Sequence, residues 1–240
     1  MGERFYVHRH SPIHSLAPHA KILAILGLLV IVVATPIQNY IAFIAYFSLV
    51  IALVLIAKLP IWQSLKRTTI EIPFIFFAIL MPFVSPDKEA AKIAAISIIA
   101  KATIGTLLAI ILSGTTPARE ILRGFETLKM PALIVQIASF MLRYLNVIND
   151  EMERMTVARA SRGFEPKGIR DWKFLAAAAG ALFIRSYERG ERVHLSMISR
   201  GYDGKLPSVQ SQLVAKQEIL IIIATLFFAL VLAIFGRNFL

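Results

Sequence analysis

Two stretches, ERMTVARASRGFEPK at residues 153–167 and ERVHLSMISRGYDGK at residues 191–205, are the most informative part of this chain. Aligned without a gap, they share Glu-Arg, six residues, Ser-Arg-Gly, an aromatic residue, an acidic residue, one residue and Lys. The offset between the copies is 38 residues (191 − 153). In both copies the glycine, which is followed by Pro or a second Gly, predicts a helix that ends at Ser-Arg-Gly.

Each helix end places an arginine beside a helix-closing glycine. Gly163 and Gly201 suit the left-handed position that terminates a helix. Arg162 and Arg200 would then lie in the last turn, where the helix dipole favours a cation by ~0.3–1 kcal/mol. Simple capping is the alternative explanation, but it does not require a Glu-Arg pair eight residues upstream of each arginine. These supporting pairs are Glu153 with Arg154, and Glu191 with Arg192.

Two equal helix ends indicate a partner with two equal grooves. Homodimers are two-fold symmetric, so one chain can engage both halves only by presenting the same shape twice. A planar, permanently charged guanidinium suits an acidic pocket. The predicted docking residues are Ser161, Arg162, Gly163, Ser199, Arg200 and Gly201.

The composition indicates a membrane protein with a basic face. Of the 240 residues, 57% are hydrophobic, against roughly 45–50% in a soluble domain. Mean hydropathy is +0.69, yet the formal net charge is +11. A nucleic-acid-binding domain would be basic without several apolar spans, so we expect no nucleic acid among the partners. The absence of cysteine excludes disulfides and thiolate metal sites.

Apolar runs predict an all-α membrane protein with about five transmembrane helices, plus two or three amphipathic cytoplasmic coupling helices. The third run contains Pro73 and Pro82. Between the fourth and fifth runs, residues 113–205 hold 15 of the 26 Lys and Arg. The apolar runs in that segment, 132–142 and 174–184, are shorter than the ~20 residues that cross a bilayer. The five predicted spans are 22–34, 40–57, 72–84, 93–112 and 219–235.

This pattern divides the chain into four parts. They are a basic arm at 1–21, four spans within 22–112, a cytoplasmic coupling region at 113–210, and a last span within 211–240. We expect the SPIHSLAPHAK segment of the arm to be irregular or a short turn, and no cleavable signal peptide.

Positive charge predicts the orientation. The arm, the 58–69 loop and the coupling region are basic, whereas the loops at 35–40 and 85–92 are not. Five spans with a cytoplasmic N-terminus place every basic segment inside the cell and the C-terminus outside. We therefore predict a multi-pass protein of the cell membrane.

The paired ends resemble the Ala-Arg-Gly helix ends of the T component of energy-coupling factor (ECF) transporters. RSYERGERVHLSMISRGYDG at 185–204, with SPIHSLAPHAKIL at 11–23, resembles the cobalt- and nickel-importing branch, CbiQ. Ser161 and Ser199 stand where this family usually has Ala, and Ala17 and His19 stand where Asp and Arg are expected. The resemblance covers the layout of the whole chain.

The resemblance implies a subunit that links two cytoplasmic ATPases to a separate substrate-binding membrane protein, of the cobalt type. Arg162 and Arg200 would insert into grooves of the ATPase pair. Closure of that pair on ATP would then move the coupling helices and reorient the substrate-binding subunit. ATP and Mg²⁺ would be used by the ATPases, and this chain would bind no cofactor.

Two further features have both functional and structural interpretations. Four histidines, His8, His10, His14 and His19, could bind a metal, but no Cys or acid lies among them; an interfacial arm is the alternative. Lys101 lies near the middle of the fourth span, where an ionisable group suggests a functional contact. Its candidate partners are Glu71 and backbone carbonyls, and snorkelling of the side chain to water is the structural alternative.

The sequence predicts no catalysis. It lacks the GxxxxGK[ST] phosphate-binding motif and the HExxH and GxSxG motifs. Coupling of cobalt or nickel uptake is the predicted function. The alternatives are a T component for a vitamin, a membrane enzyme with a basic inner-face active site, and a self-sufficient channel or permease.

Overall fold

A computed structural model describes residues 11–36, 39–60, 66, 68–163, 172–204, 222–225, 227 and 229–231. Contacts divide the chain into two compact units. We call Phe5–Leu128 with Gln212–Leu240 the span unit, and Met1–Arg4 with Lys129–Ser211 the hairpin unit. Every regular element in the described residues is helical, which confirms the predicted all-α class.

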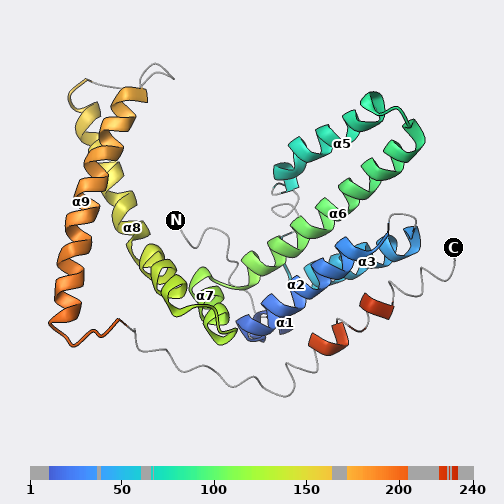
Figure 1. The fold of residues 1–240 in the computed structure, drawn as a ribbon, viewed down its shortest axis with the longest axis horizontal. Coiled ribbons are helices and arrows are strands. Elements are labelled where there is room, and N and C mark those ends of the chain that lie inside the picture. The colour runs from blue at the N-terminus through green and yellow to red at the C-terminus, as the bar shows by residue number, and fades with distance from the viewer. Residues whose placement is uncertain are drawn as a thin grey trace. The chain divides into compact units, whose positions relative to one another are not determined.

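The span unit is a set of mostly apolar helices (Figure 1). Prolines begin several of them: Pro18 opens α2, and Pro73 lies in the first turn of α5, where its missing N–H has no cost. Asp87 caps α6, its side chain accepting from the Ala90 N–H at 3.1 Å. The elements are α1 Pro12–Ser15, α2 Pro18–Ala34, α3 Tyr40–Ile56, η1 Thr68–Glu71, α5 Ile72–Val84, α6 Lys88–Thr115 and α7 Ala118–Thr127.

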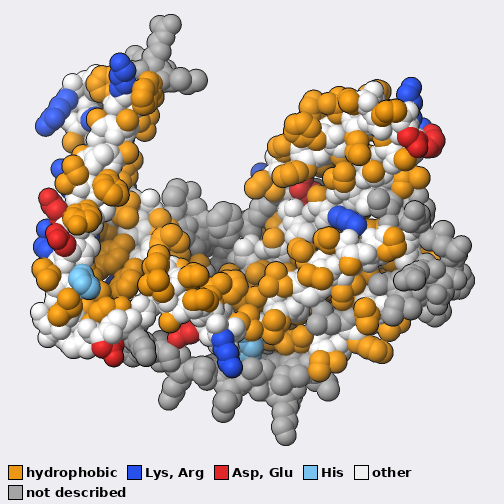
Figure 2. Space-filling model, viewed as in Figure 1, with side chains coloured by type: hydrophobic (Ala, Val, Ile, Leu, Met, Phe, Trp, Pro, Cys, Tyr) orange, Lys and Arg blue, Asp and Glu red, His pale blue; other side chains and the backbone are white. Residues whose placement is uncertain are grey.

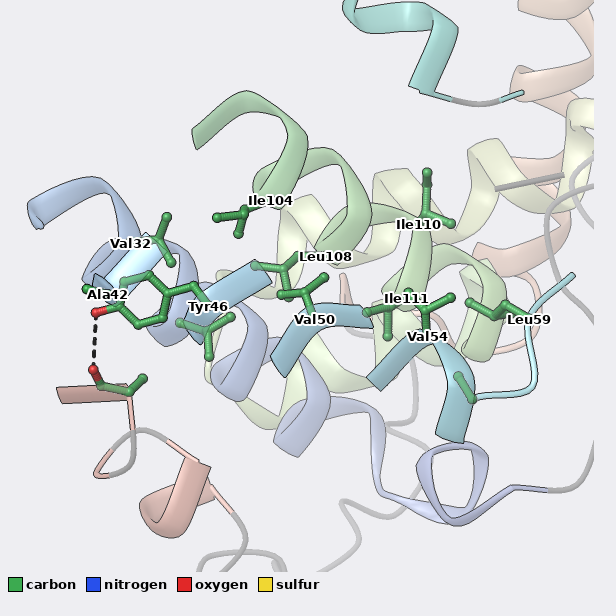
Figure 3. Packing of buried hydrophobic residues seen from close by; sticks show 13 residues of the cluster. Val32, Ala42, Tyr46, Val50, Val54, Leu59, Ile104, Leu108, Ile110 and Ile111 are labelled. Carbon is green, nitrogen blue, oxygen red and sulfur yellow. Dashed lines mark hydrogen bonds between the residues drawn. The ribbon is translucent and has the colours of Figure 1, made fainter. Parts of the chain in front are cut away.

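The core of the span unit lies where α2, α3 and α6 meet. In Figure 3 the buried side chains of these helices point toward one another. Buried residues four apart on α3 form one stripe, as expected for a helix that packs along one face. The labelled members are Val32 from α2, Ala42, Tyr46, Val50 and Val54 from α3, Leu59, and Ile104, Leu108, Ile110 and Ile111 from α6.

Tyr46 links the last predicted span to this core. Its side chain is fully buried, and its hydroxyl donates to the carbonyl of Ala229 at 3.2 Å (Figure 3). The same hydroxyl lies 3.2 Å from that of Thr35, at the end of α2. Ala229 is itself completely buried in the core cluster. The described part of the predicted fifth span therefore packs against α3.

The outer surface of the span unit is strongly apolar. Phe74, Phe77 and Phe83 on α5 are 64%, 69% and 80% exposed. Figure 2 shows hydrophobic side chains over the visible faces of α5 and α6. A contiguous apolar surface of this extent is unfavourable in water and indicates contact with lipid or another apolar surface.

The hairpin unit consists of two long helices, α8 Ala132–Ala160 and α9 Trp172–Ile198 (Figure 1). They run antiparallel, because Tyr202 beyond the end of α9 bonds to Gln136 near the start of α8. By length and composition, α6 and α8 could each cross a membrane, and the other apolar helices are shorter. The predicted runs 132–142 and 174–184 are thus the apolar parts of helices of 29 and 27 residues.

The predicted spans differ from the observed helices mainly at their ends. The third predicted span coincides with α5, which has Pro73 in its first turn and Pro82 inside the helix. The second differs from α3 by one residue. The first was predicted from residue 22, but α2 begins at Pro18, so part of the predicted arm is helical. A second helix, α1, occupies Pro12–Ser15 of the segment predicted to be irregular or a short turn.

Candidate functional site

The two Ser-Arg-Gly ends are closed by the same hydrogen bonds. At the end of α8, the N–H groups of Ser161, Arg162 and Gly163 donate to the carbonyls of Val157, Arg159 and Ala160 at 2.9, 3.0 and 2.9 Å. At the end of α9, the equivalent bonds measure 3.0, 3.0 and 2.9 Å, and each donor and acceptor lies 38 residues further along the chain. The sequence repeat is therefore also a structural repeat.

The serines take part in this closure. The Ser161 hydroxyl donates to the Val157 carbonyl at 3.1 Å, and the Ser199 hydroxyl donates to the Leu195 carbonyl at 2.9 Å. Each of these carbonyls already accepts the backbone N–H of the same serine, so the hydroxyl adds a second donor to an acceptor in that turn. Ser in place of Ala therefore preserves the shape of the end.

Gly163 and Gly201 adopt the left-handed conformation predicted for them, with φ of 75° and 82°. At Gly201 the following N–H, from Tyr202, donates to the Met197 carbonyl at 3.0 Å, which completes the closing motif. The corresponding residue of the first copy, Phe164, lies outside the described residues. A Cβ at either glycine would meet no atom within 4 Å, so the constraint is the backbone conformation and not space.

Arg162 and Arg200 are exposed at these ends. The α-helices end at Ala160 and Ile198, so the arginines lie in the closing turn and not, as predicted, in the last helical turn. Among the residues described, neither guanidinium has an ion pair or side-chain hydrogen bond. Both are therefore available to a partner.

The supporting Glu-Arg pairs lie on the exposed faces of the two helices. Glu153, Glu191 and Arg192 are exposed. Arg154 donates to the Asp150 carbonyl at 3.3 Å and lies 3.9 Å from the carboxylate of Glu151. Their contribution to a partner contact is untested by the structure and remains a prediction.

Two contacts that hold the hairpin together were not predicted. Arg185 of α9 forms an ion pair with Glu151 of α8. Gln136 accepts from the Tyr202 hydroxyl at 3.1 Å and donates to the Gly204 carbonyl at 3.4 Å. The second contact fixes the turn at the Arg200 end onto α8. Apolar periodicity gives no signal for polar pairs 34 to 68 residues apart.

An apolar groove runs between α8 and α9. Its volume is about 390 Å³, and a single arginine, Arg189, lies among its lining residues. Much of the adjoining α8 surface is also apolar: Leu133, Ile137 and Met141 are 67%, 60% and 61% exposed. The groove lining includes Ile137, Phe140 and Tyr144 from α8, with Val193 and Met197 from α9.

Lys101 makes a backbone contact inside the span unit. Its ammonium donates to the Val33 carbonyl at 2.8 Å, in the last turn of α2, and lies 5.9 Å from the centre of the Phe43 ring. Of the two candidate partners, the structure favours the backbone carbonyl. Glu71 is buried and accepts instead from the Thr103 hydroxyl at 3.1 Å. Lys101 thus joins α6 to the end of α2.

Of the four histidines in the arm, the structure describes His14 and His19. His14 Nδ1 lies 2.7 Å from the Ser11 hydroxyl, which caps α1. His19 is buried in the first turns of α2. In the described part of the chain, no three His, Cys, Asp or Glu residues come together as metal ligands. His8 and His10 lie outside that part, so the four-histidine hypothesis as a whole stays open.

These features define a helical membrane protein with a basic, hairpin-shaped interaction region and two equivalent exposed ends. The family model for cobalt transport proteins, CbiQ, matches residues 9–213. The chain therefore belongs to the CbiQ family of cobalt transport proteins. The predicted resemblance to T components of ECF transporters is confirmed, and the chain is a membrane subunit of such a transporter.

Individual relatives agree with this assignment. The chain is 23% identical to the energy-coupling factor transporter transmembrane protein EcfT of Staphylococcus aureus, over 86% of this chain and 87% of that protein. It is 26% identical to the cobalt transport protein CbiQ of Rhodobacter capsulatus, over 62% and 63%. It is also 23% identical to an uncharacterized protein of Methanocaldococcus jannaschii, over 100% and 89%.

Proposed function

We propose that this chain couples ATP hydrolysis by two cytoplasmic ATPase subunits to a substrate-binding membrane subunit, and that the complex imports cobalt or nickel. The observation that carries the proposal is the pair of Ser-Arg-Gly helix ends. They are closed by the same hydrogen bonds, and they lie at opposite ends of the hairpin that α8 and α9 form. Arg162 and Arg200 are the residues that insert into the ATPases. ATP and Mg²⁺ bind to the ATPases, and cobalt is cargo and not a resident cofactor of this chain.

The antiparallel course of α8 and α9 supports a symmetric partner. Two antiparallel helices of similar length are related by an approximate two-fold axis that passes between them. That axis exchanges the carboxyl end of α8 with the carboxyl end of α9, and so exchanges Arg162 with Arg200. A dimer of ATPases has the same symmetry and offers each end the same groove.

The spacing of the ends also suits two separate grooves. The 27 residues of α9 extend for about 40 Å at 1.5 Å per residue. Tyr202 lies beside the start of α8, so Arg200 and Arg162 are near opposite ends of this length. Two sites this far apart call for two protein subunits and not one pocket.

The groove between α8 and α9 supports the proposed contact with a substrate-binding membrane subunit. Its lining is almost wholly apolar, as is the adjoining surface of α8. An exposed apolar surface of this kind marks a site of contact with another protein or with the membrane. We propose that the substrate-binding subunit packs here, with the N-terminus of this chain in the cytoplasm, its C-terminus outside, and the complex in the cell membrane.

A charge-reversal experiment tests the docking sites. Arg162→Glu with Arg200→Glu should abolish copurification of the ATPases and cobalt uptake, because each end would then repel an acidic groove. Either single variant should retain part of the ATPase copurification and part of the cobalt uptake, since the remaining site still binds its ATPase. Uptake of Co²⁺, Ni²⁺ and vitamins by the intact complex distinguishes a metal importer from a vitamin importer.

The matched control is Lys88→Glu with Lys92→Glu, which makes the same charge change at two exposed lysines of α6, outside the hairpin unit. This control should retain the ATPases. The proposal is wrong if the arginine double variant retains them equally well, or if the wild-type chain retains none.

A further inference from the structure

Lys21 occupies an unusual position at the start of α2. Its side chain is buried, with 4% exposed, and its ammonium donates to three oxygens. These are the His14 carbonyl at 3.2 Å, the Thr115 carbonyl at 3.3 Å and the Thr116 hydroxyl at 3.2 Å. An ammonium has three donors, so every one of them is used.

The acceptors come from two places far apart in sequence. His14 belongs to α1, whereas Thr115 is the last residue of α6 and Thr116 is its C-cap. Both threonines are buried, at 2% and 1% exposed. A cation at this point meets the unpaired carbonyls and the negative pole of the α6 terminus. Lys21 therefore ties the amino-terminal segment to the end of α6.

The same turn of α2 also holds α7, the first helix after α6. A Cβ on Gly124 of α7 would come within 2.8 Å of the Ile22 Cδ1 atom and 3.1 Å of the His19 backbone nitrogen. Only a glycine permits this approach without a shift of one helix. The corner between α6 and α7 is thus fixed to α2 on both sides, by charged hydrogen bonds at Lys21 and by close packing at Gly124.

This corner is where the chain leaves the spans and enters the basic region. We propose that Lys21 is a positioning residue for energy coupling: it holds α7 and the end of α6 to α2, so that movement of the basic region reaches the membrane helices. The inference rests on the proposed function. If the contacts of Lys21 were lost, the ATPases would still bind this chain and hydrolyse ATP. The membrane helices, however, would not move together with the basic region.

The test compares transport with hydrolysis in the complete complex reconstituted in liposomes, with Co²⁺ as the transported probe. Lys21→Met keeps an unbranched side chain that is shorter by one atom, and it removes the ammonium. We expect the ratio of Co²⁺ uptake to ATP hydrolysis to fall by roughly tenfold or more, since charged hydrogen bonds that link the two movements are lost. Copurification of the ATPases should remain near the wild-type level. Lys92→Met, at an exposed lysine of α6, should leave the ratio unchanged.

Gly124→Ala perturbs the same corner from α7 without touching Lys21, and it should lower the same ratio. Gly180→Ala is its control, because a Cβ there meets no atom within 4 Å. If Lys21→Met does not accumulate in the membrane, the ratio of Co²⁺ uptake to ATP hydrolysis in Gly124→Ala tests the inference on its own.

Two results would overturn the inference. One is a wild-type ratio in the corner variants. The other is a parallel loss of ATPase binding, hydrolysis and uptake, which would mean that Lys21 only stabilises the fold. A wild-type chain that retains no ATPase would instead refute the proposed function on which the inference depends.

Discussion

At the scale of single residues, the helix ends depend on backbone conformation more than on side-chain contacts. Gly163 and Gly201 lie in open space but have φ values that L-residues rarely adopt. The closing hydrogen bonds place the N–H groups of both arginine-bearing turns against the last carbonyls. The glycines therefore set the direction in which the chain leaves each helix, directly after Arg162 and Arg200.

Gly201→Ala should destabilise the α9 end by roughly 1 kcal/mol, because a Cβ is unfavourable in the left-handed region. Thermal unfolding of the purified chain measures this, and copurification of the ATPases should weaken in step. Gly180→Ala, in the middle of α9, should instead stabilise by about 0.5–1 kcal/mol, since it removes a helical glycine. Equal stability of the two variants would contradict this account.

At the scale of elements, the sequence predicted helix positions well and their contacts poorly. Apolar runs located α3 and α5 to within a residue, because hydrophobic length and helix length coincide there. They placed the start of α2 too late, because the helix begins at Pro18 and its first turn contains the polar residues His19 and Lys21. The Ser-Arg-Gly repeat gave the ends of α8 and α9, since Gly and Pro signals are local.

The contacts between elements depend on polar groups brought together only by folding. Lys21 meets Thr115, 94 positions away, and Arg185 meets Glu151, 34 positions away. Neither pair has a periodic signature in one sequence. Lys101 was singled out because a charge inside an apolar run is conspicuous, whereas Lys21 lies at the border of a run and was not.

The pair formed by Arg185 and Glu151 should stabilise the hairpin measurably. Arg185 is 58% exposed but Glu151 only 19%, so we expect a coupling energy of about 0.5–1 kcal/mol. A double-mutant cycle of Glu151→Gln and Arg185→Gln, followed by thermal unfolding, gives this value. The control cycle uses Lys92 and Glu89, a neighbouring pair that is 58% and 80% exposed and should couple more weakly. Stronger coupling in the control would refute this ranking.

At the scale of the whole molecule, the predicted orientation can be tested directly because the chain contains no cysteine. A cysteine at Lys88 should react with a membrane-impermeant maleimide added to intact cells. A cysteine at Lys173, in the basic region, should react only after the cells are permeabilised. The wild-type chain supplies an unlabelled background. Labelling of the Lys173 variant in intact cells would reverse the proposed orientation.

The hairpin also limits the kind of movement that can pass through the molecule. A helix of 27 residues has a nearly fixed length, so two seated ends that are drawn together cannot shorten it. In the proposed coupling, such an approach would instead change the angle at which α8 and α9 cross, with the ion pair of Arg185 and Glu151 still joining the two helices. A new crossing angle alters the width of the apolar groove between the helices. If ATP draws the two ATPases together in the cytoplasm, the effect on the membrane side would thus be a change in the shape of this apolar groove.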